Sequence, residues 1–182
     1  MADEVFVVPL KRFDVAKERL RRGGVENVTG LASDLATAVI ESCAPRRVIV
    51  VSESSDVTRF ALDRGVEVLE SEATSLNEAV QGAYERLRER FDRIVVVHGD
   101  LRDPRGLAEF EPDAGITIIT DHLLRGTNVL VVPTGLDFHF RYGDDSAESH
   151  RAEAERLGVS YRMVTDSPWR FDVDEPGDVT AP

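Results

Sequence analysis

The chain has 182 residues, of which 42% are hydrophobic and 31% charged, and its formal net charge at pH 7 is −12. This length predicts one domain, residues 1–182, with a core of its own, and the acidic balance argues against a nucleic-acid-binding or lipid-binding surface. No apolar run is long enough to cross a membrane, and the first residues lack the pattern of a signal peptide, so a cytoplasmic location is expected.

Short apolar runs alternate with amphipathic segments along the chain. In chain order the pattern predicts a strand at 5–8, a helix at 26–43, a strand at 47–52, a helix at 56–64, a strand at 66–69, a helix from a capping box at 75–78 to about 91, strands at 94–97, 115–120 and 127–132, a helix at 145–157, and strands at 160–164 and 170–173. This order is typical of a single-domain three-layer α/β/α sandwich with a mostly parallel mixed sheet, Rossmann-like in kind. The single cysteine, Cys43, is expected to be a buried packing residue of its helix.

Ligands of such sheets gather at the carboxyl ends of the strands. Both lysines of the chain, Lys11 and Lys17, follow the first strand, in a segment that carries six of the 22 basic residues. Lys11, Lys17 and Arg19 are suited to pairing with a triphosphate. The alternative, that residues 17–22 form the solvated face of a short helix, stays open. The chain has neither a Walker A motif nor a G-x-G-x-x-G fingerprint.

Carboxylates follow two later strands. Asp172 and Asp174, two residues apart in an extended segment, would point to the same side at roughly 7 Å separation. Together with Asp100 they could converge on one Mg²⁺ ion, a hard cation that takes oxygen ligands. Alternatively, Asp174 only caps a helix that begins within DEPGD.

A second anion feature is expected where residues 141–146 enter the helix at 145–157. Backbone N–H groups and the Ser146 hydroxyl would face an anion there, although Ser146 could be a plain helix cap. His150 lies one helical turn later and could face the same site. The histidines show no metal-binding spacing, and no G-x-S-x-G elbow is present, which disfavours covalent catalysis. Two anion features suggest two phosphorylated ligands.

Taken in order, these segments resemble the CofC/FbiD family of guanylyltransferases, a branch of the MobA-like nucleotidyltransferases. The segments that carry the resemblance are VPLK with AKERL, SLNEAV, HGDLRD, RGTNVLVV, HFRYGDDSAESH and FDVDEPGD. The resemblance implies transfer of GMP from GTP to 2-phospho-L-lactate or phosphoenolpyruvate, with release of pyrophosphate, on the route to coenzyme F-420.

The resemblance also implies roles for individual residues. Lys17 and Asp100 would be catalytic. The nucleotide would be bound by Lys11, Lys17, Arg19 and Asn77, the acceptor by Thr127, Gly143 and Ser146, and Mg²⁺ by Asp100, Asp172 and Asp174. The chain departs from the family pattern at Arg102, where a proline is usual, and in the short stretch from there to 115, so the acceptor's identity stays open.

Three other interpretations stay open. A nucleotidyltransferase of this fold could use 3-phosphoglycerate, a sugar phosphate or a molybdopterin-type acceptor, although the glycine-rich first loop of the sugar and molybdopterin relatives is absent. The protein could instead be a non-catalytic nucleotide-binding subunit, or its basic loop could dock an acidic partner. Oligomeric state does not follow from the sequence, and a homodimer stays open.

Overall fold

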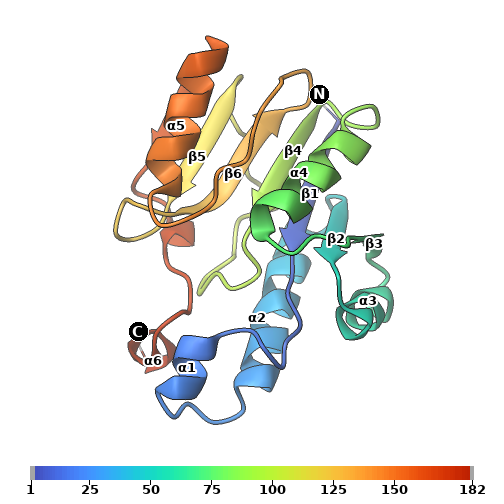
Figure 1. Cartoon of the computed structure of the whole chain (residues 1–182), viewed down its shortest axis with the longest axis vertical. Coiled ribbons are helices and arrows are strands. Elements are labelled where there is room, and N and C mark those ends of the chain that lie inside the picture. The colour runs from blue at the N-terminus through green and yellow to red at the C-terminus, as the bar shows by residue number, and fades with distance from the viewer. Residues whose placement is uncertain (1–2, 181–182) are drawn as a thin grey trace.

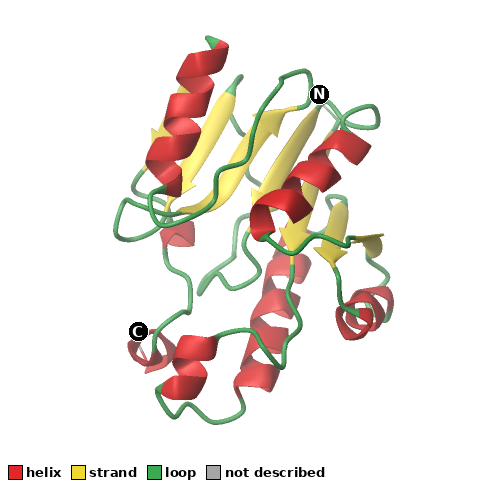
Figure 2. Cartoon of the chain, viewed as in Figure 1, coloured by secondary structure: helices red, strands yellow, loops and turns green. Residues whose placement is uncertain are grey.

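Alternating apolar strands and amphipathic helices build three layers in the computed structural model, which describes residues 3–180 (Figures 1 and 2). The middle layer is a sheet of seven strands within these residues, in the order β3-β2-β1-β4-β6-β5-β7. The strands are β1 (Glu4–Pro9), β2 (Val48–Ser52), β3 (Glu67–Glu70), β4 (Arg93–Val97), β5 (Ile116–Thr120), β6 (Thr127–Pro133) and β7 (Tyr161–Val164). Only β6 runs antiparallel to its neighbours, so the predicted mixed, mostly parallel sheet is confirmed.

Helices cover both faces of this sheet. They are α1 (Glu18–Arg22), α2 (Val28–Cys43), α3 (Ser55–Leu62), α4 (Leu76–Leu87), α5 (Ser146–Leu157) and α6 (Pro176–Thr180). Successive side chains of a strand point to opposite faces, so Val5 and Val7 join the core under α4 and α5, whereas Phe6 and Val8 join the core under α2 and α3. No helix within residues 3–180 is long and apolar enough to span a bilayer.

Several local expectations are confirmed. The Ser75 hydroxyl accepts a hydrogen bond from the Glu78 N–H and caps α4. Cys43 is fully buried, and burial raises the pKa of its thiol to about 12, so it packs as a small hydrophobic residue.

The predicted strand at 170–173 is wrong. Pro168–Arg170 form a short 3₁₀ helix, and Asp172 makes only an isolated antiparallel bridge with Leu101. The backbone pairs locally with the loop after β4: Arg102 N–H donates to Phe171 C=O (2.8 Å) and Val173 N–H donates to Asp100 C=O (3.0 Å). This pairing is what brings the C-terminal carboxylates next to Asp100.

A small apolar cluster completes this end of the molecule. Leu20 of α1, Val28 of α2 and Val173 are buried against one another. Figure 1 shows the result, with the first and last helices side by side below the sheet. The basic loop after β1 is thereby held against the C-terminal segment.

Candidate active site

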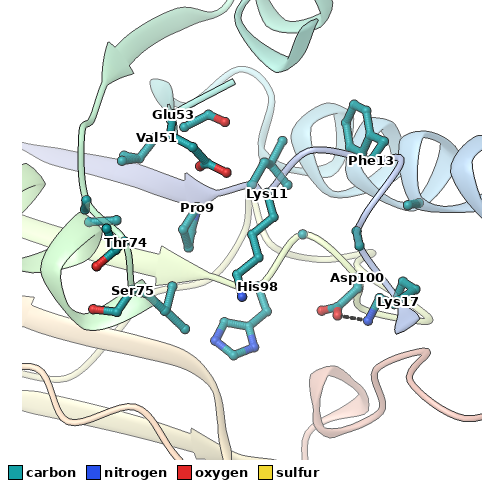
Figure 3. A pocket seen from close by; sticks show the side chains of 18 of the residues that line it. Pro9, Lys11, Phe13, Lys17, Val51, Glu53, Thr74, Ser75, His98 and Asp100 are labelled. Carbon is teal, nitrogen blue, oxygen red and sulfur yellow. Dashed lines mark hydrogen bonds and ion pairs between the residues drawn. The ribbon is translucent and has the colours of Figure 1, made fainter. Parts of the chain in front are cut away.

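A cavity of about 350 Å³ opens at the carboxyl ends of β1, β2 and β4 (Figure 3). We call it the first pocket; its charged and titratable lining residues are Lys11, Lys17, Glu53, His98, Asp100 and Asp174. Lysines and aspartates thus meet at the sheet edge where ligands of this architecture bind. The volume lies within the usual range for small-molecule sites.

Lys17 is the central cation of the first pocket. Its backbone is left-handed (φ 60°) immediately before α1, and its side chain is only 9% exposed. The ammonium contacts Asp100 Oδ2 and lies 3.3 Å from Asp174 Oδ1. Burial opposes the charge, but the carboxylates, Asp100 foremost, outweigh it and raise the pKa of Lys17 above its usual value. Lys17 is therefore a charged counter-ion of these aspartates.

The Asp172 carboxyl lies close enough to Asp100 for the two to interact electrostatically. Burial, and then the charge of Asp100, raise the pKa of the Asp172 carboxyl above its usual value. Asp100 Oδ1 is itself buried and has no hydrogen-bond partner within residues 3–180. Asp100 thus keeps one carboxylate oxygen that the Lys17 ammonium does not use.

Asp100, Asp172 and Asp174 are not already arranged as a metal cluster, and their role as Mg²⁺ ligands stays a prediction. Within residues 3–180 the structure contains no group of three or more His, Cys, Asp or Glu side chains arranged to hold a metal ion. The physical reason is the Lys17 ammonium, which lies between Asp100 and Asp174. The residues nevertheless fit Mg²⁺ chemically, because the unpaired Asp100 Oδ1 and the carboxylates of Asp172 and Asp174 are hard oxygen donors.

The remaining predicted nucleotide residues lie in different places. Lys11 is exposed and lines the first pocket. Arg19 is 66% exposed at the edge of the site and donates to Asp174 Oδ2 at 2.9 Å. Within residues 3–180 the Asp174 carboxylate pairs with Lys17 and Arg19 and accepts no backbone N–H, so it does not act as a helix cap. Residues 18–22 do form a short helix, and its Arg22 pairs with Glu18 on the solvated side. The segment thus includes a solvated helix face, whereas phosphate binding by Lys11, Lys17 and Arg19 stays a prediction.

Asn77, the fourth predicted nucleotide residue, lines a second pocket and not the first. Its amide nitrogen donates to Tyr142 C=O (2.9 Å), and its amide oxygen accepts from Tyr142 N–H (2.6 Å). The second pocket, about 360 Å³, is lined by Asn77, Tyr142, Gly143 and Ser146, among others. Asn77 thus fixes the loop that enters α5.

The predicted acceptor residues are brought together around the start of α5. Gly143 and Ser146 line the second pocket, and Thr127 is buried behind Ser146, with their hydroxyl oxygens 3.2 Å apart. Behind Thr127 lies His150, fully buried, with Nδ1 3.0 Å from Thr127 Oγ1.

The hydrogens of this network can be assigned. Because a backbone N–H only donates, His150 Nε2 accepts from Arg141 N–H (3.0 Å) and carries no hydrogen. Burial lowers the pKa of His150 to about 3, so the neutral ring carries its hydrogen on Nδ1 and donates it to Thr127. The bond between the Thr127 and Ser146 hydroxyls uses one of their two hydrogens. Ser146 is the donor of that bond, so the remaining hydrogen belongs to the Thr127 hydroxyl, which is buried and does not line the second pocket.

His150 is the residue whose role the sequence left most open. The sequence feature that indicated a role for His150 is its spacing of four residues from Ser146, which places both side chains on one side of a helix. His98 was not singled out, yet its ring lies 5.4 Å from that of Tyr142, between the two pockets.

Arg102, where the chain departs from the family pattern, contacts the C-terminal segment. Its guanidinium donates to Asp178 Oδ1 (3.3 Å) and lies 5.3 Å from the centre of the Phe171 ring. Asp178 Oδ2 in turn accepts from the backbone N–H groups of Asp174 and Glu175. Arg102 therefore fastens the segment that carries Asp172 and Asp174 to the loop that carries Asp100.

Sequence comparison matches residues 4–181 to the family model "Guanylyl transferase CofC like". A phosphoenolpyruvate guanylyltransferase of Chloroflexus aggregans is 29% identical over 92% of this chain and 91% of its own length. A 2-phospho-L-lactate guanylyltransferase of Methanothermobacter thermautotrophicus is 27% identical over 95% of this chain and 81% of its own. A 3-phospho-D-glycerate guanylyltransferase of Phenylobacterium zucineum is 30% identical over 74% and 66%.

Solved structures share the fold at low sequence identity. A putative nucleotide-diphospho-sugar transferase of Desulfovibrio desulfuricans superposes with a TM-score of 0.77 at 15% identity, covering 98% of this chain and 85% of that one. A nucleotidyl transferase of Methanothermobacter gives a TM-score of 0.69 at 17% identity, covering 97% and 94%. These matches confirm a single α/β domain of the nucleotidyltransferase fold.

Proposed function

The chain belongs to the CofC-like guanylyl transferase family, and from this premise we propose that it transfers GMP from GTP to the phosphate of a small phosphorylated carboxylic acid and releases pyrophosphate. We propose phosphoenolpyruvate or 2-phospho-L-lactate as the acceptor, in coenzyme F-420 biosynthesis in the cytoplasm. The observation that carries the proposal is the pair of pockets, one lined by lysines and aspartates and one at a helix N-terminus, which adjoin at His98 and Tyr142.

The first pocket is assigned to the nucleotide. Lys11 and Lys17 supply positive charge for the phosphates, with Arg19 at the edge. Mg²⁺ held by Asp100, Asp172 and Asp174 would neutralise charge on the α-phosphate and on the leaving pyrophosphate. Lys17 already neutralises Asp100 and Asp174, so it keeps the carboxylate segments together before the nucleotide binds.

The second pocket is assigned to the acceptor. The positive end of the α5 dipole and the backbone at Gly143 favour an anion in this pocket, although the N–H groups of Ser146 and Ala147 already donate to the carbonyls of Gly143 and Arg125. Asn77, for which the family resemblance implied a nucleotide contact, holds the loop that forms this pocket.

The proposed chemistry needs no strong general base. An oxygen of the acceptor phosphate, already anionic at neutral pH, attacks the α-phosphorus of GTP; a new P–O–P bond forms, the bond to the β-phosphate breaks, and pyrophosphate leaves with its electron pair. The protein's task is to hold two anions in line and to neutralise the charge that develops between them.

An acceptor panel tests this proposal. The purified protein is incubated with Mg²⁺ and GTP together with phosphoenolpyruvate, 2-phospho-L-lactate or 3-phospho-D-glycerate, and pyrophosphate is measured. The third acid is included because a relative carries that name. We expect release with one of the first two acids. Release with 3-phospho-D-glycerate alone would change the acceptor, and no release with any acid would refute the proposed transfer.

A further inference from the structure

The first pocket has two chemically different ends (Figure 3). Lys17 and Asp100 mark one end, where charged phosphates belong. The other end lies between the end of β2 and the segment after β3, where Val51, Glu53, Thr74 and Ser75 are seen in Figure 3. The apolar residues Val51, Ala73 and Leu76 of these segments line the pocket there. A nucleotide whose phosphates lie near Lys17 must place its uncharged, planar base at this apolar end.

Most polar side chains at the base end are already engaged in local caps. The Ser52 hydroxyl accepts from Ser54 N–H (3.2 Å), and the Ser75 hydroxyl accepts from Glu78 N–H (3.2 Å). The Thr74 hydroxyl donates to Glu78 Oε2 (3.0 Å). These groups hold the ends of β2 and α4, and none of them presents the two adjacent acceptor oxygens that a pair of donors on a base requires.

Glu53 is different. Its carboxylate has no hydrogen bond or ion pair with any residue in the described range 3–180, and it is the only acidic group at the base end. The charge of Glu53 raises the pKa of Arg12 slightly, but Asp14 is the main cause of the raised pKa. The Arg12 guanidinium donates two hydrogen bonds to the Asp14 carboxylate, at 3.0 and 2.5 Å. Glu53 therefore brings two free acceptor oxygens to the pocket.

We propose that Glu53 selects guanine by accepting hydrogen bonds from its N1–H and its 2-amino group. This inference rests on the proposed function and adds a specificity-determining residue to it. Guanine presents those two donors side by side, and a carboxylate presents two acceptors at matching spacing. Adenine and cytosine present one donor beside a ring-nitrogen lone pair, which a carboxylate repels. The acidic side chain thus favours GTP and disfavours ATP and CTP.

The test compares GTP with ITP, whose base lacks only the 2-amino group, and with ATP. For the wild type we expect kcat/KM for GTP to exceed that for ITP roughly tenfold to a hundredfold, the range for one hydrogen bond to a charged acceptor. Glu53→Gln should bring the GTP-to-ITP ratio close to one and raise the relative use of ATP, because an amide pairs with adenine's donor and acceptor. Glu72→Gln, the same change at a neighbouring exposed residue outside the first pocket, is the matched control.

Binding separates this inference from the proposed transfer. Isothermal titration of the wild type and of Glu53→Gln with GTP and with ITP measures the base preference without turnover. If Glu53→Gln keeps the wild-type GTP-to-ITP ratio in binding and in transfer, Glu53 does not read the base, and the proposed function stands. If the wild type binds GTP selectively and loses that selectivity on substitution but transfers nothing, Glu53 reads the base and the transfer proposal fails. Absence of GTP binding by the wild type would overturn both.

Discussion

Replacing Lys17 by Met removes the charge at the centre of the site and keeps an unbranched side chain of similar length. The side chain is 9% exposed, and its partners Asp100 and Asp174 are 23% and 42% exposed. Breaking a fully buried pair costs about 3–5 kcal/mol, and an exposed pair contributes about 0–1 kcal/mol. Because Asp100 is mostly buried and its Oδ1 already lacks a partner, we expect a loss of about 2–3 kcal/mol.

Thermal unfolding followed by circular dichroism measures this loss. For a chain of this size, about 2–3 kcal/mol corresponds to a fall in Tm of roughly 5–10 °C in metal-free buffer. Mg²⁺ should raise the Tm of Lys17→Met more than that of the wild type, because in the variant the carboxylates have no ammonium for the metal to displace. The same variant should lose at least about a hundredfold in kcat with GTP.

Lys11→Met is the matched control, since Lys11 lines the same pocket but is exposed. It should change stability by less than about 0.5 kcal/mol. If Lys17→Met unfolds at the wild-type temperature without metal, or if Mg²⁺ shifts both proteins equally, the ammonium is not what neutralises these carboxylates.

Two further predictions follow from the residues around the two pockets. Arg102→Ala should weaken Mn²⁺ binding, measured by electron paramagnetic resonance as a stand-in for Mg²⁺, about tenfold, because the segment with Asp172 and Asp174 loses its anchor; unchanged binding would contradict the positioning role. Because the pKa of His150 is lowered to about 3 in the folded protein, its imidazole binds a proton below about pH 6.5 only in the unfolded chain. We therefore expect the contribution of His150 to the free energy of unfolding to fall by about 1.4 kcal/mol per pH unit between about pH 6.5 and 3. Urea unfolding at several pH values should show this slope in the wild type and not in His150→Gln, which retains an acceptor for Arg141 N–H; equal slopes in both proteins would show that His150 is not held neutral by the fold.

The sequence predicted what local chemistry determines. Apolar runs such as 94–97 gave the strands, and the capping box at Ser75 gave the start of α4. The strand at 170–173 was wrong because its pairing with the loop after Asp100 depends on contacts between distant parts of the chain.

For the site residues too, the sequence did not predict contacts between distant parts of the chain. Sequence identified Lys17, Asp100 and Asp174 as candidates but did not predict that the ammonium pairs with both carboxylates, which lie 83 and 157 residues away along the chain. It identified Asn77 but not the direction of its amide, which depends on where the loop at Tyr142 folds. Residue types and spacing thus indicate which groups carry chemistry, whereas packing decides what each one contacts.

Phosphorus-31 NMR of the reaction mixture, recorded before and after addition of GTP to protein, Mg²⁺ and the acceptor identified by the panel, tests the central claim most directly. Wild-type protein should convert the monophosphate resonance of the acceptor into a pair of diphosphate resonances, with equimolar pyrophosphate, and folded Asp100→Asn should not. Pyrophosphate without a new diphosphate ester, or an Asp100→Asn variant that turns over at the wild-type rate, would contradict the account.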